Sequence, residues 1–201
     1  MNATTSTTVT CDVSISVDGF VAGPNQSQQN PLGEGGMLLH EWHIAPQGDD
    51  QAVIDEWQRA PGAYIMGRNM FGPDRGDWDL DWHGWWGDEP PYGVPVFVLG
   101  HQPREPLAVG RTTFHFVTDG IDAALAAAAE AARGGNVAIA GGASTINQYL
   151  AAGHIDQLHL HVAPVLLGTG ERLFDGVGRL ALKPIEVTGS PGATHIKYAV
   201  G

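Results

Sequence analysis

Three short stretches end an apolar run in glycine and continue with residues that can hold a phosphate. In the first, VAIAGGAST, the glycines are Gly141 and Gly142. Backbone N–H groups at a helix start lack partners and attract anions, and glycine lets a ligand approach the backbone closely. The same pattern can also form a plain strand-to-helix corner, with Thr145 and Gln148 as a capping box. This stretch alone leaves the phosphate cradle and the corner as equal alternatives.

The other two stretches place arginines directly after the glycine. In IMGRN, Arg68 follows Gly67, and in VLGHQPR, His101 and Arg104 follow Gly100. A guanidinium group matches a phosphate bidentately, although an arginine at such a position can also be an ordinary surface residue. Because ligands of α/β proteins bind outside the carboxyl ends of the strands, the three stretches together predict one anion-binding edge.

A carboxylate and two histidines occupy strand-like segments that are otherwise apolar. Asp12 lies in VTCDVSISV, which alternates apolar and polar residues, and His159 and His161 share one face of QLHLHVA. Carboxylates are rarely buried without a partner or a role, so Asp12 is either a proton donor or substrate anchor, or a structural residue on a solvated face. The two histidines have no third ligand at a recognisable spacing, so we expect no metal, and His161 is expected to line a pocket.

The composition limits the class of protein. The chain has 201 residues, 43% of them hydrophobic, which suits one folded domain, expected over residues 9–201 after a flexible tail at 1–8. Ten basic and 22 acidic residues give a net charge of −12, which argues against a nucleic-acid partner. A single cysteine, no secretory signal and no long apolar run favour a cytoplasmic protein that makes no membrane contact.

Strand and helix patterns alternate along the chain. Strands are expected at 9–17, 63–67, 95–100, 113–117, 137–140 and 155–167, and helices at 49–59, 119–135 and 143–153. The segment 182–200 reads as a hairpin. This order predicts an α/β fold with a mainly parallel sheet, helices on both faces and antiparallel terminal strands. A loop at 72–95 with four tryptophans is expected to be a lid, a subunit contact or a packed loop.

Four longer stretches occur in an order that resembles a known family. They are SVDGFVAGP (16–24), IMGRNMF (65–71), VFVLGHQPRE (96–105) and the block from IAGGAST to GERLF (139–174). The chain is similar to the dihydrofolate reductase-like superfamily, in particular to the RibD C-terminal reductase domain of riboflavin biosynthesis, over roughly residues 9–180. The resemblance implies a mixed, mostly parallel central sheet flanked by helices, with antiparallel C-terminal strands.

The resemblance also implies roles for individual residues. It places Asp12 and His161 in the substrate pocket as catalytic groups. NADPH is the implied cofactor. Its nicotinamide would lie by Val21 and Ala22, its phosphates by Gly67, Arg68 and Asn69, its adenosine ribose by Leu99, Gly100, His101 and Arg104, and its pyrophosphate by Gly141, Gly142, Ala143, Ser144 and Thr145. Gly100 stands where relatives often have Ser or Thr against the 2′-phosphate, so NADH stays open as an alternative.

The activity implied is hydride transfer from NADPH to a C=N or C=O group of a small heterocycle. Such a substrate would be pterin- or pyrimidine-like, as for dihydrofolate reductase or 5-amino-6-(5-phosphoribosylamino)uracil reductase, and the protein would be a homodimer. Dihydrofolate reductases carry an acid on the first helix, for which this chain offers Glu41 in GGMLLHEWH. The alternative is a nucleotide-binding module that keeps the fold without catalysis.

Overall fold

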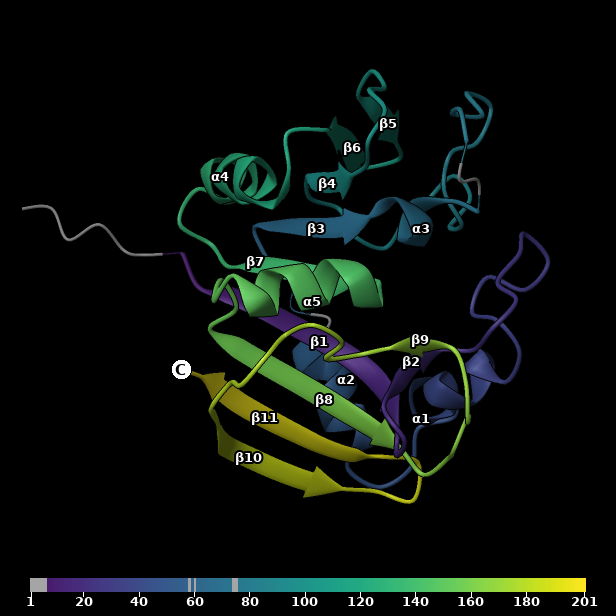
Figure 1. Cartoon of the computed structure of the whole chain (residues 1–201), viewed down its shortest axis with the longest axis vertical. Coiled ribbons are helices and arrows are strands. Elements are labelled where there is room, and N and C mark those ends of the chain that lie inside the picture. The colour runs from purple at the N-terminus through teal and green to yellow at the C-terminus, as the bar shows by residue number, and fades with distance from the viewer. Residues whose placement is uncertain (1–6, 58, 60, 74–75) are drawn as a thin grey trace, which may run out of the picture.

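A nine-stranded mixed sheet forms the centre of the molecule (Figure 1). The computed structural model describes residues 7–57, 59, 61–73 and 76–201, so most of the expected N-terminal tail lies outside the described residues. The strands, in their order across the sheet, are β10 (Leu182–Gly189), β11 (Thr194–Val200), β8 (Gln157–Ala163), β1 (Val9–Ser16), β7 (Val137–Gly141), β3 (Ala63–Gly67), β4 (Val96–Leu99), β6 (Thr112–Val117) and β5 (Leu107–Val109).

From β8 to β6 all neighbouring strands run parallel, whereas β10, β11 and β5 add antiparallel pairs at the two sides. This arrangement confirms the predicted fold class. Sequence patterns missed the short strands β5, β2 (Phe20–Ala22) and β9 (Glu171–Arg172), the last two of which pair with each other. Strands of two or three residues are too short to show an alternation.

Helices cover both faces of the sheet, as predicted (Figure 1). The helical elements are η1 (Gly36–His40), α1 (Glu41–Ile44), α2 (Asp50–Trp57), α3 (Arg68–Phe71), α4 (Ile121–Ala132) and α5 (Ala143–Ala151). On one face, α4 and α5 bury a core that includes Cys11, Ile65 and Ile139 from three adjacent strands. In the described part of the chain, none of the helices has the length and apolarity that spanning a bilayer demands.

The second face is divided between two coverings. The helices η1, α1 and α2 lie over the β1, β8 and β11 side, while α3 and the tryptophan loop (72–95) cover β3, β4 and β6. Within that loop Trp78, Trp82 and Trp86 pack against a second buried cluster that contains Phe71 and Phe114. The indole N–H of Trp82 donates to the carbonyl of Phe71 at 2.8 Å. The structure therefore shows that this part of the loop is packed against the sheet, and the lid and the subunit contact stay predictions.

Candidate functional site

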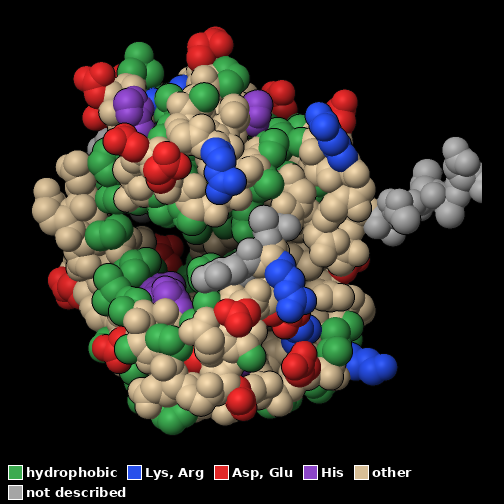
Figure 2. Space-filling model, turned by 180° about the vertical axis from the view of Figure 1, so that it is seen from behind, with side chains coloured by type: hydrophobic (Ala, Val, Ile, Leu, Met, Phe, Trp, Pro, Cys, Tyr) green, Lys and Arg blue, Asp and Glu red, His purple; other side chains and the backbone are tan. Residues whose placement is uncertain are grey.

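A cavity of about 710 Å³ lies on the second face, between α2 and the sheet. Figure 2 shows this side of the molecule hollowed, with a histidine at the margin of the hollow. The floor is made by side chains of β1, β7, β8, β3 and β11, and the wall by α2 and the end of the tryptophan loop. Because strand side chains alternate between faces, the residues that leave the apolar core on each strand line this cavity.

Asp12 and His161 both line the cavity, which brings together the two residues predicted as catalytic. Asp12 on β1 is directly opposite His159 on β8, and its Oδ1 lies 2.7 Å from His159 Nδ1. His161 is opposite Ser14, two residues further along the strands and on the same face, and its Nε2 lies 3.9 Å from Asp12 Oδ1. This last distance is too long for a hydrogen bond, so a ligand or water can bind between the two groups.

His161 begins a chain of buried polar groups that sequence reasoning missed. Its Nδ1 lies 2.9 Å from Nδ1 of His195 on β11, and Nε2 of His195 lies 2.9 Å from Oδ1 of Asp50 on α2. His161 and His195 are each 5% exposed and Asp50 is fully buried. The chain therefore links the cavity to an interior carboxylate through two imidazole rings.

The ionised carboxylate of Asp50 determines which nitrogen donates in each of these hydrogen bonds. Burial opposes ionisation of Asp50, but hydrogen bonds from Ser190, the Gln47 backbone N–H and His195 hold its pKa below the ordinary value. As a carboxylate Asp50 only accepts, so Nε2 of His195 carries the proton and its Nδ1 is an acceptor. His161 must then donate from Nδ1, which leaves its Nε2 bare beside Asp12. Burial lowers the pKa of His161 to about 3, in agreement with a neutral ring.

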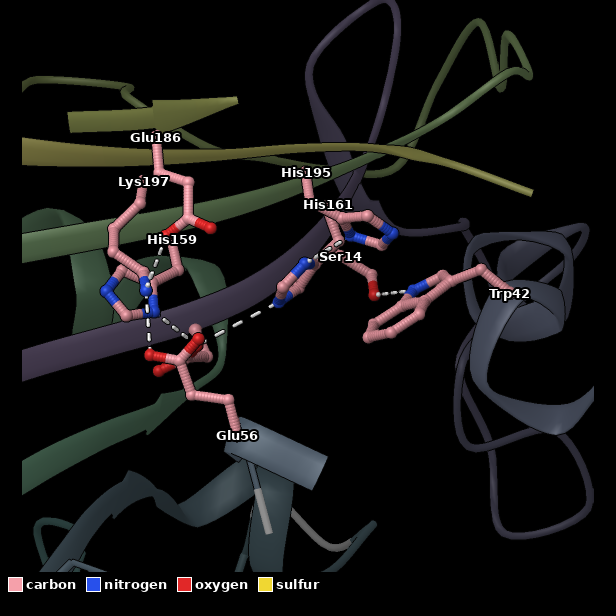
Figure 3. A network of polar contacts seen from close by, with 9 residues as sticks. Ser14, Trp42, Glu56, His159, His161, Glu186, His195 and Lys197 are labelled. Carbon is pink, nitrogen blue, oxygen red and sulfur yellow. Dashed lines mark hydrogen bonds and ion pairs between the residues drawn. The ribbon is translucent and has the colours of Figure 1, made fainter. Parts of the chain in front are cut away.

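Trp42 on α1 packs against the two imidazole rings (Figure 3). Its ring lies 4.5 Å from the ring of His161 and 4.8 Å from that of His195, and its Nε1–H donates to Ser14 Oγ at 2.9 Å. The indole is 2% exposed. This packing holds both imidazoles in one orientation and keeps water away from the His161–His195 contact.

The outer end of the cavity carries a lysine enclosed by carboxylates (Figure 3). Nζ of Lys197 lies 2.7 Å from Glu56 on α2 and 3.2 Å from Glu186 on β10. The charged residues among those that line the cavity are Asp12, Glu56, Arg59, Glu186 and Lys197. Carboxylates outnumber cations, and the lysine is neutralised, so the lining favours ligands without negative charge.

The three glycine-ended strands meet at one edge of the sheet, as predicted. β7, β3 and β4 are parallel neighbours, with Met66 opposite Gly141 and Gly67 opposite Leu99. A Cβ on Gly67 would lie 2.4 Å from Thr145 Oγ1, so glycine allows β3 to end against the start of α5. The cavity reaches this edge at Ala140, which precedes the glycine turn, and at Met70, which lies in α3.

Helix α5 begins without a side-chain cap. Its N-cap residue is Gly142, the Gly141–Gly142 peptide bond is cis, and Gln148 donates to the carbonyl of Ser144 instead of closing a capping box. The predicted capping box between Thr145 and Gln148 is therefore wrong, since the helix starts two residues before Thr145. The N–H groups of the first turn, including those of Ala143 and Ser144, keep the anion-binding character of an uncapped helix start.

The predicted arginines hold the tryptophan loop. The Arg68 guanidinium lies 3.9 Å from the Trp78 ring centroid and donates to the carbonyl of Asp77. Arg104 donates to the carbonyls of Asp79, Leu80 and Trp82. Both side chains stand at the predicted edge, but their contacts fix the loop over β4 and β6.

The remaining predicted cofactor residues surround the same edge. His101 and Asn69 are exposed, and Gly100 lies beside Trp78 and Arg68. Val21 and Ala22 belong to β2, directly beyond the carboxyl end of β1. The roles assigned to these residues stay predictions. Among the described residues no group of three or more His, Cys, Asp or Glu side chains could hold a metal ion.

Sequence reasoning found one end of the polar chain and missed the other. Glu41, the acid suggested on the first helix, is exposed, whereas the buried acid is Asp50 at the start of α2. His195 and Lys197 do share one face of a predicted strand, a pattern that could have drawn attention to them. Asp50 gave no such signal, because a helix-start aspartate is common on protein surfaces.

Comparison with known proteins shows the family of this chain. The model of the RibD C-terminal domain matches residues 7–195. The chain belongs to this family. No curated protein sequence matches the chain. The match spans β1, β8 and the whole chain between them, which includes the three glycine-ended strands.

Solved structures share the fold at low sequence identity. A putative riboflavin biosynthesis protein from Shewanella is 22% identical with a TM-score of 0.65, and the match covers 96% of this chain and 99% of that one. The riboflavin biosynthesis reductase of Saccharomyces is 12% identical with a TM-score of 0.62, covering 100% and 93%. A Thermotoga maritima deaminase/5-amino-6-(5-phosphoribosylamino)uracil reductase is 12% identical with a TM-score of 0.60, covering 97% of this chain and 57% of the longer protein.

Proposed function

We propose that this RibD C-terminal domain protein is an NADPH-dependent reductase of a small heterocyclic substrate. The observation that carries the proposal is the position of the cavity. It holds Asp12 and His161 at its floor and reaches Ala140 and Met70 at the glycine edge. A cofactor at the edge and a substrate in the cavity would meet there, a short distance from two groups able to handle a proton.

The residues at the edge fit a dinucleotide. The start of α5 offers N–H groups without a side-chain cap, and a Cβ on Gly142 would meet no atom within 4 Å, so the backbone there borders open space. When bound, the nicotinamide supplies a hydride, and the protein supplies orientation and the proton. Asp12, held by His159, and the bare Nε2 of His161 would bind and orient the polar edge of the substrate.

The cavity lining favours an uncharged or cationic substrate. Three carboxylates (Asp12, Glu56 and Glu186) line the cavity with two cations (Arg59 and Lys197), and Lys197 is ion-paired with both glutamates. A phosphoribosyl group, which the printed name of the Thermotoga relative includes, would meet this lining with like charge. The substrate we propose is therefore a C=N- or C=O-containing ring without phosphate.

The test is a titration with NADPH and, separately, NADH, followed by nicotinamide fluorescence and thermal stability. Ser144→Asp adds a negative charge to the first turn of α5, where it suits the helix dipole but repels a pyrophosphate. We expect the variant to keep its melting temperature and to bind NADPH at least about tenfold more weakly. Ala126→Glu, which adds the same charge on an exposed position of α4, is the control and should bind like the wild type.

No response of the wild type to millimolar NADPH or NADH would overturn the proposal. Cofactor binding in which hydride is transferred to no offered pteridine or pyrimidine would instead favour the nucleotide-binding module without catalysis. That second function rests on one observation, which is that Glu41, at the position suggested for the dihydrofolate reductase acid, is exposed.

A further inference from the structure

The buried chain Asp50–His195–His161, hereafter the relay, ends in an imidazole nitrogen that faces the cavity without a hydrogen-bond partner among the described residues. His161 lines the cavity, and its Nε2 contacts Asp12 Oδ1 only at 3.9 Å. Every other position along the relay is hydrogen-bonded, from Gln47 through Asp50 and His195 to Nδ1 of His161. An open imidazole nitrogen at a cavity wall can accept a hydrogen bond or a proton from a ligand, and the hydrogen bonds behind it hold the ring in place.

We propose that Asp50 and His195, the buried part of the relay, stabilise the proton that His161 takes up at Nε2 and delivers in the reduction. The inference rests on the proposed reductase function and assigns His161 as the catalytic donor. His195 and Asp50 are positioning residues that act through it. The hydrogen-bond directions in the resting state, set by the acceptor-only Asp50, leave Nε2 of His161 ready to take up a proton.

The loaded state follows from one additional proton. A proton that binds Nε2 of His161 displaces the Nδ1 proton to Nδ1 of His195. His195 then carries N–H on both nitrogens and the positive charge lies 2.9 Å from the Asp50 carboxylate. An imidazolium is stabilised by a buried carboxylate at that distance, whereas the same charge on His161 would lie deep in the cavity wall.

Delivery reverses these moves. The proton on His161 Nε2 passes to the substrate nitrogen or oxygen, and the shared proton returns to His161 Nδ1. His195 thereby becomes neutral again and keeps its Nε2–H on Asp50. The two rings together hold three N–H protons before the step and two after it. With the hydride on carbon, the substrate gains the two hydrogens that reduction of a C=N or C=O bond requires.

Other titratable groups surround the relay. Asp12, His159 and His43 face His161, and their charges act on its protonation. Around His195, Trp42 packs on the ring and Lys197 follows two residues along β11. The Asp12 carboxylate favours a positive charge on the His161 ring. The carboxylate in contact with His195 is that of Asp50.

The relay can be tested without cofactor or substrate, by ¹⁵N NMR of histidine side chains. In the wild type at about pH 8, where unpaired histidines are neutral, we expect His161 to carry Nδ1–H with Nε2 bare and His195 to carry Nε2–H. On acidification the first proton taken up by the pair should convert His195 to the doubly protonated ring. This measurement needs no variant, so it stands even if a substitution prevents folding.

Asp50→Asn should reverse the tautomers. The Gln47 N–H can only donate, so the oxygen of the introduced amide takes that bond and its NH₂ group faces His195 Nε2. His195 would then carry Nδ1–H and His161 would carry Nε2–H, because an amide in place of a buried carboxylate changes the tautomer of the histidine that it contacts. Asp122→Asn, at the exposed His154–Asp122 pair, is the control and should leave both signals unchanged.

An Nε2–H tautomer of His161 in the neutral wild type would overturn the relay, as would unchanged tautomers in a folded Asp50→Asn protein. These outcomes are separate from the cofactor titration. If the wild type shows the expected tautomers but does not bind NADPH or NADH, the reductase proposal is rejected. If it binds the cofactor but shows the other tautomers, only the relay is rejected.

Discussion

The close approach of β3 to α5 at Gly67 gives a sharp prediction about the edge assigned to the cofactor. Gly67 has φ −78° and ψ 157°, which an alanine adopts freely, so Gly67→Ala introduces only its Cβ. That Cβ would lie 2.4 Å from Thr145 Oγ1, and the next nearest atoms are at 3.6 and 3.7 Å. Thr145 is 6% exposed, so it cannot swing into solvent.

The magnitude follows from this geometry. Restoring an ordinary contact needs a movement of about 1 Å between the strand end and the helix, and overpacking of this kind costs about 1–3 kcal/mol. For a domain of this size, each kcal/mol lowers the melting temperature by about 2–4 °C. We therefore expect Gly67→Ala to melt about 2–12 °C lower, and to bind NADPH more weakly because the first turn of α5 is displaced.

A double-mutant cycle separates this cause from others. Thr145→Ala removes Oγ1, so the double variant should be about as stable as Thr145→Ala alone, and the two effects should not add. Thr145→Val keeps a methyl group at the place of Oγ1 and should give no rescue. Thermal and denaturant unfolding measure all of these. An unchanged melting temperature of Gly67→Ala, or strictly additive effects with Thr145→Ala, would refute the reasoning.

Two further outcomes follow from charged groups. The Ser16 hydroxyl and two backbone N–H groups lower the pKa of Asp18 to about 2, so the stability that Asp18 adds over Asp18→Asn should be full above about pH 4 and vanish as the pH falls through 2, measured by denaturant unfolding. Glu56→Gln combined with Glu186→Gln removes both ion pairs of Lys197, so the double variant should bind ribose 5-phosphate, as measured by calorimetry. Tight binding of that ligand to the wild type would contradict the proposed substrate class.

The sequence by itself determined the parts of this protein that depend on local pattern. Period-2 alternation placed β1, and with it Asp12 on the face opposite Cys11, because successive strand side chains point to opposite sides. Glycines after apolar runs indicated the ends of β3, β4 and β7, and parallel strands bring such ends to one edge. The resemblance of the longer stretches then gave the family.

The tertiary structure decided what depends on register and on contacts between distant segments. His195 reaches His161 because β11 pairs with β8 in one register out of several, and a shift by one residue would turn it to the other face. Asp50 meets His195 because a loop and α2 fold over the sheet, 145 residues away along the chain. Arg68 and Arg104 are of a residue type that often binds phosphate, yet in the structure they contact loop carbonyls and Trp78. Residue types show which chemistry is available, but the partner of each charged group is set only when the whole chain packs.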